Sequence, residues 1–171
     1  TQPMNRFSID VSGDVPLIAT PQRHTMVMPT TLAGYPNQVS IALYPIENQL
    51  ADKVMAMYQD YGTHQASTRY HDLYDAAQII NQLPIDAAVL DRALIIQQQR
   101  RHFTLPEGLP EPAPGWGHTY NQVAATKMPG ALPPLTNYET AITTVRGQII
   151  PALDRITAND ARNTIRQLAT H

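Results

Sequence analysis

A few charged side chains in this chain have the types and spacing needed to handle phosphate groups or metal ions. Lys53, one of only two lysines, falls at the edge of the apolar stripe of a predicted helix. Its stem either snorkels so that the ammonium reaches water, or its charge points into a cleft and meets a phosphate or a carboxylate. Asp72 and Asp75 are three residues apart, which places both carboxylates on one side of a helix. These side chains are candidates for a phosphate or metal site.

Asp10 is a further candidate, at the centre of a segment in which apolar and polar residues alternate. Alternation with a period of two is typical of a β-strand with one buried face. Asp10 is then either part of the polar face of this strand or a rigidly held carboxylate aimed at a metal ion or a base.

A purely structural interpretation exists for the acids at 72 and 75. Acidic residues in the first turn of a helix interact favourably with its dipole, by typically 0.3–1 kcal/mol. Thr68 is well placed to cap such a helix. Capping does not explain why Arg69 and His71 crowd the same turn, so both interpretations stay open.

Composition removes several other kinds of chemistry. The chain has no cysteine, so disulfides, thiolate nucleophiles and cysteine-based zinc sites are excluded. It contains no HExxH pair, no G-x-S-x-G turn and no glycine-rich phosphate loop. The net charge of −2 gives no strong electrostatic attraction to nucleic acid or to a membrane surface. The single tryptophan, Trp116, is predicted to be a core anchor or a lid.

The elements that must position these residues follow from hydrophobic periodicity. Hydrophobic residues make up 43% of the 171 residues, which indicates a globular chain with a substantial core. Strands are predicted over residues 7–11, 23–29 and 38–45. Helices are predicted over 46–60, 70–83, 86–100 with Asp86 as N-cap, 116–127 and 136–153 with a possible kink at Pro151, and only weak helical character after that. The Pro- and Gly-rich stretch 105–117 is predicted to be irregular.

Three quoted segments, in this order and spacing, resemble one known family. They are "FSIDVSGDVP", "YPIENQLADKVMAMY" and "STRYHDLYDAAQII". Together they resemble the AbiEii/AbiGii toxins, a nucleotidyltransferase-like family, over residues 7–80. Ala51-Asp52-Lys53 stands where that family has Ala-Glu-Lys, and residues 69–75 stand for its Arg-x-Lys-Asp-x-x-Asp helix start, with His71 in place of lysine.

The resemblance implies an α+β fold with a partial polymerase-β-like nucleotidyltransferase sheet of about three strands, followed by a mostly helical bundle. It divides the chain into 1–45, the partial β region, 46–104, the helices with the Lys and Asp motifs, and 105–171, the Pro-rich loop and last helices. It implies transfer from an NTP with Mg²⁺, in some members to tRNA. By this resemblance Asp10, Lys53 and Asp72 are catalytic, Asp10 also holds metal, and Lys53, Arg69 and Asp75 bind the nucleotide.

The sequence departs from the family at its first motif. Neither the Gly-Ser turn nor the Asp-x-Asp pair that would hold two metal ions occurs in the chain. Together with the opening directly on a strand, this predicts the C-terminal portion of a toxin, inactive alone. The alternative is a non-catalytic helical module that binds an antitoxin or another subunit.

The sequence also leads to expectations about binding partners and cellular location. The resemblance implies a cognate antitoxin, and tRNA as an acceptor in some members. A homodimer through an exposed sheet edge is a further expectation. The absence of cysteine, of a signal peptide and of any apolar run of roughly 18–20 residues predicts a cytoplasmic protein outside the membrane.

Overall fold

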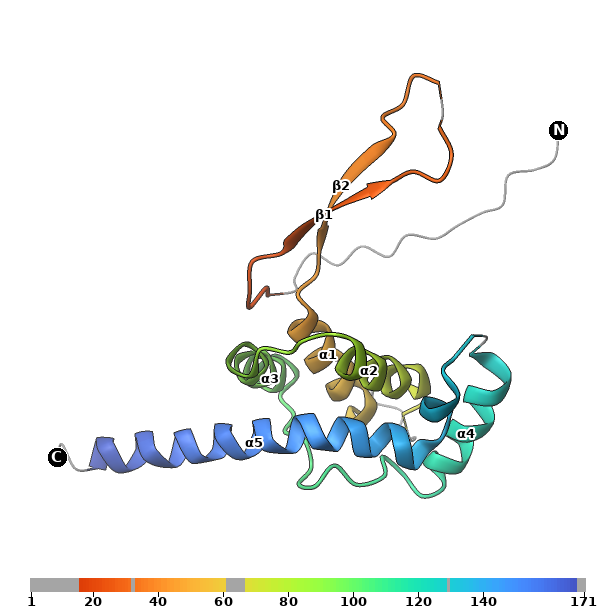
Figure 1. Ribbon diagram of the computed structural model, residues 1–171. Helices are drawn as coiled ribbons and strands as arrows, with labels where there is room; N and C mark the ends of the chain where they lie inside the picture. Colours follow the sequence, from red (N-terminus) through yellow and green to blue (C-terminus); the bar gives the residue numbers. More distant parts are fainter. Residues whose placement is uncertain (1–15, 32, 61–66, 129, 169–171) are drawn as a thin grey trace.

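The computed structural model describes residues 16–31, 33–60, 67–128 and 130–168, without the side chains from 163 onward. A two-stranded hairpin precedes a helical body, as Figure 1 shows, so the fold is α+β with helices dominant. The elements are β1 (Gln22–Val27), β2 (Gln38–Leu43), α1 (Ile46–Tyr58), α2 (Tyr70–Gln82), α3 (Ala87–Arg101), α4 (Trp116–Lys127), the short 3₁₀ helix η1 (Pro133–Thr136) and α5 (Tyr138–Leu168).

Helix α1 is the most deeply buried helix of the body: eight of its 13 residues are buried, and it packs against both α2 and α3. Its consecutive residues Val54, Met55, Ala56 and Met57 are at most 1% exposed, so burial extends around more than one face of the helix. A helix that is apolar on more than one face must be enclosed by neighbours. Helix α5 crosses beneath α2 and α3, and α4 closes one end of the body against α2 and α5 (Figure 1).

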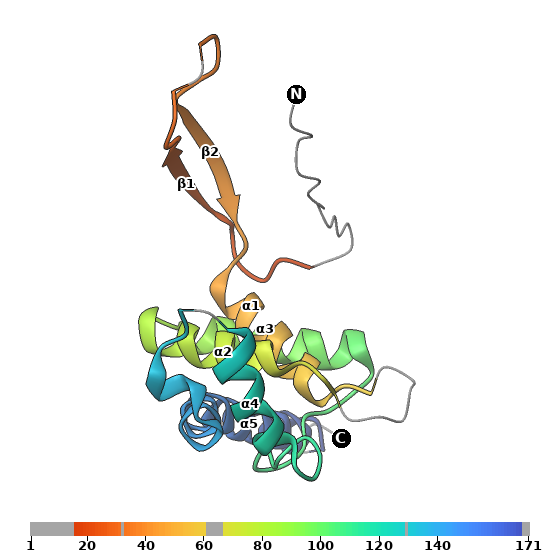
Figure 2. The ribbon, with the colours of Figure 1, turned by 90° about the vertical axis from the view of Figure 1, so that its right-hand side faces the viewer.

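The hairpin stands away from the helical body, and Figures 1 and 2 show this from two directions. Its strands are antiparallel, with Met26 opposite Val39 and Gln22 opposite Leu43. Almost every strand residue is exposed. The predicted strands over 23–29 and 38–45 are confirmed as β1 and β2, whereas the third predicted strand, over 7–11, lies outside the described residues.

A buried asparagine ties the chain before the hairpin to the start of α1. The Asn48 side chain is 1% exposed, and its Nδ2 donates to the carbonyl of Pro16 at 3.0 Å. Its Oδ1 accepts from the backbone N–H of Ile18 at 3.3 Å. The amide satisfies a donor and an acceptor of the backbone at once, so segment 16–18 is held against the body.

The observed helices confirm most of the helices predicted from periodicity and correct the prediction in two places. Asp86 caps α3 as predicted, since its Oδ1 accepts from the N–H of Val89 at 2.9 Å. Thr68 was expected to cap α2, and this is wrong: Arg69 occupies the cap position without a side-chain cap, and Ser67 Oγ accepts the N–H of Arg69 at 3.3 Å.

Helix α5 was expected to end near residue 153, but it runs through Pro151 to Leu168. Proline costs an interior helix about 3 kcal/mol because it removes one backbone hydrogen bond and crowds the preceding turn. Ile149 and Ala152, on either side of the proline, are fully buried, as is most of Ile156 one turn later. Packing on both sides of Pro151 therefore holds the helix together. No helix in the described ranges is long and apolar enough to cross a membrane.

The contact between α4 and α5 gives a first prediction. A Cβ added at Gly117 would lie 2.5 Å from Cδ1 of the buried Tyr138 ring, whereas one added at Gly147 would meet nothing within 4 Å. We expect Gly117→Ala to lower the free energy of unfolding by about 1–3 kcal/mol through overpacking. The matched control, Gly147→Ala on α5, should be neutral or stabilise by up to about 1 kcal/mol. Urea denaturation measures both, and equal effects would contradict the close packing of α4 on α5.

Candidate functional site

Four charged side chains meet where α1 lies against the first turns of α2. Lys53 Nζ donates to Asp75 Oδ2 at 2.6 Å and to Asp72 Oδ1 at 3.3 Å. Arg69 Nε lies 2.8 Å from the other oxygen of Asp72, as an ion pair without the alignment of a hydrogen bond. We call these four residues the α1–α2 charge cluster. Two cations and two carboxylates make its formal charge zero.

The two carboxylates of the cluster differ in their exposure. The side chain of Asp72 is 13% exposed and that of Asp75 is 41% exposed, while Lys53 is intermediate at 24%. Asp72 is therefore mostly buried and paired with two cations, whereas the carboxylate of Asp75 is accessible to water. The snorkelling interpretation of Lys53 does not hold, because its ammonium binds carboxylates on the neighbouring helix.

The Lys53 ammonium has a raised pKa. Burial lowers the pKa, but the hydrogen bond and charge of Asp75, followed by those of Asp72, more than offset this effect. The pKa consequently lies above its usual value of 10.5, and Lys53 is charged at neutral pH.

The Ala-Asp-Lys segment on α1 sends three consecutive side chains in three directions. Ala51 is fully buried in the core. Asp52 pairs with Arg100 and Arg101 at the end of α3. Lys53 reaches the acids of α2. Successive helix residues are about 100° apart, so this short motif fixes α1 against two neighbours at once.

Trp116 positions the start of α2, from which Asp72 and Asp75 project. Its indole Nε1 donates to the carbonyl of Ser67, and its ring centroid lies 4.7 Å from that of Tyr70. Ser67 Oγ also donates to the carbonyl of Ala56 at the end of α1, at 3.3 Å. Trp116 is 2% exposed, so the prediction of a core anchor is confirmed.

Sequence reasoning missed the role of Ser67. The available signal was Trp116 itself, because a buried indole N–H needs an acceptor, and the carbonyl of Ser67 precedes α2 and is not used by the hydrogen bonds of that helix.

The structure thus brings together Lys53, Arg69, Asp72 and Asp75, which the sequence places on two separate helices. His71 is exposed beside them. Asp10 lies outside the described residues. Within the described ranges no three His, Cys, Asp or Glu residues gather in a way that could hold a metal ion. The described side chains alone do not form a magnesium site.

Comparison with known proteins gives one match. The family model described as nucleotidyl transferase AbiEii toxin, Type IV TA system, matches residues 1–159 of the 171. The chain belongs to this family. No curated protein and no solved structure matches the chain. An AbiEii chain is expected to be a nucleotidyltransferase toxin of a type IV toxin–antitoxin system, which implies an NTP substrate and an antitoxin partner.

The unequal exposure of the two acids predicts unequal effects on stability. Asp72→Asn removes the charge shared by Lys53 and Arg69 in a mostly buried place, and should lower the free energy of unfolding by about 1–3 kcal/mol. Asp75→Asn breaks an exposed pair and should cost about 1 kcal/mol or less. Urea denaturation of the two variants compares them, and a larger loss for Asp75→Asn would contradict this account of the cluster.

The raised pKa of Lys53 predicts a loss of stability at alkaline pH. A raised folded-state pKa stabilises fully below the unfolded value of 10.5, and this stabilisation fades as the pH rises through the folded value. The difference in unfolding free energy between wild type and Lys53→Met should stay constant between neutral pH and 10.5, and it should shrink above 10.5 as the ammonium loses its proton. The tyrosines titrate in both proteins, so their contribution cancels in the difference in unfolding free energy. A difference that grows with pH would oppose the prediction.

Proposed function

We propose that the α1–α2 charge cluster forms the phosphate-binding wall of the NTP site in an AbiEii nucleotidyltransferase toxin. One observation carries the proposal: Lys53, on the most buried helix, directs its ammonium at the N-terminal turns of α2 while about a quarter of its side chain stays accessible. Arg69, 53% exposed, stands beside it. Two cations within reach of solvent suit the oxygens of a triphosphate.

The two acids have different parts in this proposal. Asp72 keeps Lys53 and Arg69 in place, because it is enclosed and contacts both. Asp75 is the exposed partner of Lys53, so the triphosphate displaces it at small cost. Lys53 then turns toward the phosphate while it keeps its contact with Asp72. The cluster binds and orients the nucleotide, and by itself it performs no bond-breaking step.

The remaining catalytic groups are proposed to lie outside the cluster. The chain lacks the Gly-Ser turn and the Asp-x-Asp pair, so we expect no transfer activity from it alone. By resemblance, Asp10 contributes one carboxylate toward Mg²⁺ in the complete toxin. The acceptor we propose is tRNA, which places the reaction in the cytoplasm.

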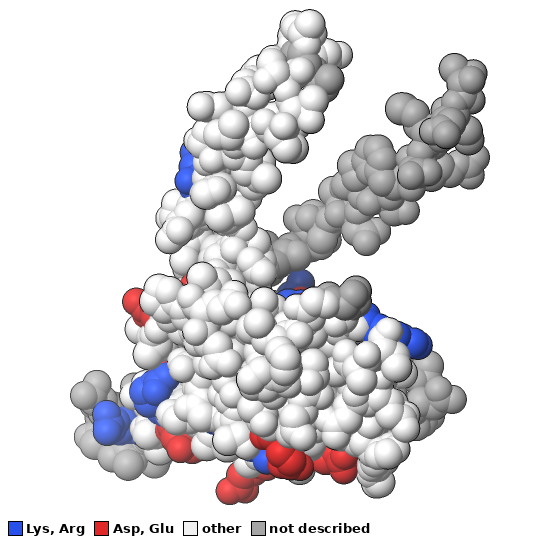
Figure 3. Space-filling view, turned by 45° about the vertical axis from the view of Figure 1, so that its right-hand side comes forward, with Lys and Arg blue, Asp and Glu red and all other residues white. Residues whose placement is uncertain are grey.

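The second candidate function is a non-catalytic module that binds an antitoxin or another subunit. The observation that favours it is the hairpin. Met26, Val39 and Leu43 lie on one face of the two strands, and each is 42–49% exposed. Figure 3 shows few charged side chains on the hairpin surface that it presents. Under this alternative the charge cluster only clamps α1 to α2.

Nucleotide binding to the chain separates the two functions. We expect MgATP or another NTP to bind weakly but saturably, with Lys53→Ala weakening binding at least tenfold, about the loss of one charge-assisted phosphate contact. Isothermal titration calorimetry measures this for each of the four NTPs.

Lys127→Ala is the matched control, because it removes the other lysine of the chain, in the last turn of α4. It should leave the affinity unchanged, and circular dichroism verifies that both variants fold. Absence of binding for all four NTPs, or equal weakening by both substitutions, would favour the non-catalytic module.

A further inference from the structure

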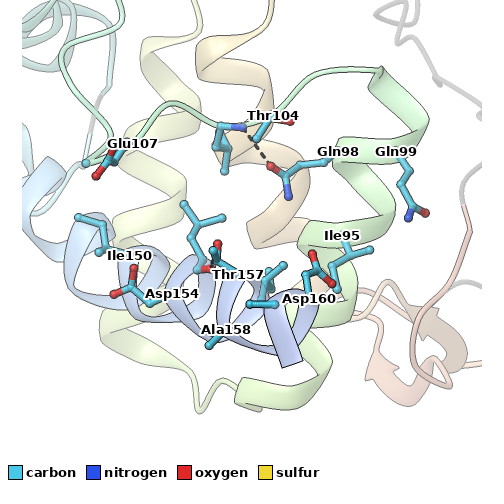
Figure 4. A pocket seen from close by; sticks show the side chains of 15 residues that line it. Ile95, Gln98, Gln99, Thr104, Glu107, Ile150, Asp154, Thr157, Ala158 and Asp160 are labelled. Atoms are coloured by element: carbon cyan, nitrogen blue, oxygen red, sulfur yellow. Dashed lines mark hydrogen bonds between the residues drawn. The ribbon is translucent and has the colours of Figure 1, made fainter. Parts of the chain in front are cut away.

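A groove of about 990 Å³ lies between α3, α5 and the segment 104–108 (Figure 4). None of its lining residues belongs to α1 or α2, so it is separate from the charge cluster. Its apolar lining comes from Ile95 of α3, Leu105 of the connecting segment, and Ile150, Leu153 and Ile156 of α5. Leu105 and Ile156 are nearly buried. We call this site the α3–α5 groove.

Helix α5 continues past the point where the rest of the chain covers it. Ile156 is the last buried residue among those whose side chains the structure describes, and residues 157–162 are all exposed. The backbone stays helical to Leu168, so about 18 Å of helix extends beyond the other helices in Figure 1. We call residues 157–168 the projecting end of α5. Because helices gain most of their stability from packing, this end is a candidate for contact with a partner.

One row of residues carries the lining of the groove along the projecting end. Leu153, Thr157 and Ala161 are spaced by four, which places them in one row on the helix, and all three line the groove. In the sequence Ile165 follows Ala161 at the same spacing. The row is mostly apolar, and it runs from the covered part of α5 to the uncovered part. Each copy of the chain therefore carries a groove floor and, further along the same helix, a segment of similar character.

The neighbouring row carries one charge of each sign. Asp154, Ala158 and Arg162 are also spaced by four, and all three are exposed. Asp154 and Ala158 border the groove (Figure 4). Neither Asp154 nor Arg162 takes part in the ion pairs of the described residues. The row consists of an acid, a small residue and a base, with Ala158 at its midpoint.

The other charged groups on this stretch differ in how far they are engaged within the chain. Arg155 donates to both carboxylate oxygens of Asp91 on α3, at 2.8 and 3.0 Å, and Asp160 has an interaction of its own. Glu107 lines the groove, is exposed and takes no part in the described ion pairs. After Asp160 the sequence contains two arginines and no acid, so the end of the chain suits a groove bordered by Glu107 and Asp154.

We propose that two copies of the chain pair through α5 in antiparallel orientation, with the projecting end of each in the α3–α5 groove of the other. A two-fold axis at Ala158 places Asp154 of each copy opposite Arg162 of the other, because these residues lie four positions before and after Ala158. The ion pair is thus made twice. A parallel arrangement would instead place each charge opposite the same charge, so the row is complementary to itself only in the antiparallel direction.

The same alignment brings the projecting end to the groove. Residues 161–168 of one copy run beside residues 148–155 of the other, where Ile150 and Leu153 line the groove. The small side chain of Ala158 at the axis allows the two helix backbones to approach closely. The interface is isologous, so one surface of the chain supplies both of its halves.

Charge reversal tests this pairing on the chain as it is. Sedimentation equilibrium should show a monomer–dimer equilibrium with a Kd on the order of 10 µM, because one helix pair is a small interface. Asp154→Arg or Arg162→Asp alone places like charges opposite each other at both ends of the pairing and should weaken dimerisation at least tenfold. The double variant restores opposite charges across the axis and should return Kd to within about threefold of wild type.

Glu139→Arg is the matched control, because it reverses an exposed acid on α5 outside the groove. It changes the net charge of the chain as much as Asp154→Arg does and should alter Kd by less than about twofold. Circular dichroism verifies that each variant is folded.

A single introduced thiol locates the axis. The chain contains no cysteine, so Ala158→Cys gives a protein with one thiol. Two such thiols at the axis come within reach of a disulfide, which needs a Cβ–Cβ distance of roughly 3.5–4.5 Å. Mild oxidation should therefore link most of the dimer through position 158. Thr143→Cys, at an exposed position of α5 outside the groove, should stay unlinked under the same conditions.

Each outcome bears on the proposal directly. A folded chain that stays monomeric up to about 500 µM would overturn it. Single reversals without effect, a double variant as weak as either single variant, or equal linking at positions 143 and 158 would also overturn it. This holds even where the chain dimerises through another surface, such as an edge of the hairpin.

Discussion

The enclosure of α1 is the constraint on which the rest of the structure depends. A helix surrounded by neighbours has no place for an unpaired polar group, because burying one without a partner costs several kcal/mol. Each polar side chain along α1 accordingly ties a different segment to it. Glu47 accepts the backbone N–H of Asp86 at 3.0 Å, Asn48 holds segment 16–18, Asp52 meets the arginines of α3, and Lys53 meets the acids of α2. The most buried helix therefore also fixes segment 16–18, which precedes the hairpin, and the orientation of α2 and α3.

The same constraint explains why the candidate site is rigid on one side and open on the other. Lys53 projects from a helix in which Ala51 and Val54 are fully buried, so its backbone cannot shift without disturbing the core. The start of α2 is fixed by Ser67, which bonds both Trp116 and the end of α1. Only the side-chain ends of Lys53, Arg69 and Asp75 remain free to respond to a ligand. This suits a site in which binding rearranges side chains and leaves the backbone in place.

Sequence reasoning found what is local and missed what depends on distant partners. The five helices, both described strands and the cap at Asp86 follow from periodicity and neighbouring residues. A helix passing Pro151 was predicted, but its extension from about residue 153 to Leu168 was not, because the sequence after Leu153 has only a weak apolar pattern. The pairing of Lys53 with Asp72 and Asp75 spans 19 and 22 residues, and periodicity indicates only that each lies near a buried face. The resemblance to a family, carried by the order of three motifs, supplied the expectation that they belong together.

The difference between Asp72 and Asp75 bears on whether the cluster is only a clamp. A clamp between α1 and α2 needs one enclosed carboxylate, and Asp72, in contact with two cations, is sufficient for it. The second acid stands at the surface, where an ion pair contributes little to stability. Asp75 nevertheless brings the cluster to zero charge and makes the shortest contact of Lys53, so an arriving anion competes with it directly. Because the enclosed contact and the exposed contact belong to different carboxylates, the proposed function requires Lys53 to exchange only Asp75 for a phosphate while Asp72 keeps it in position.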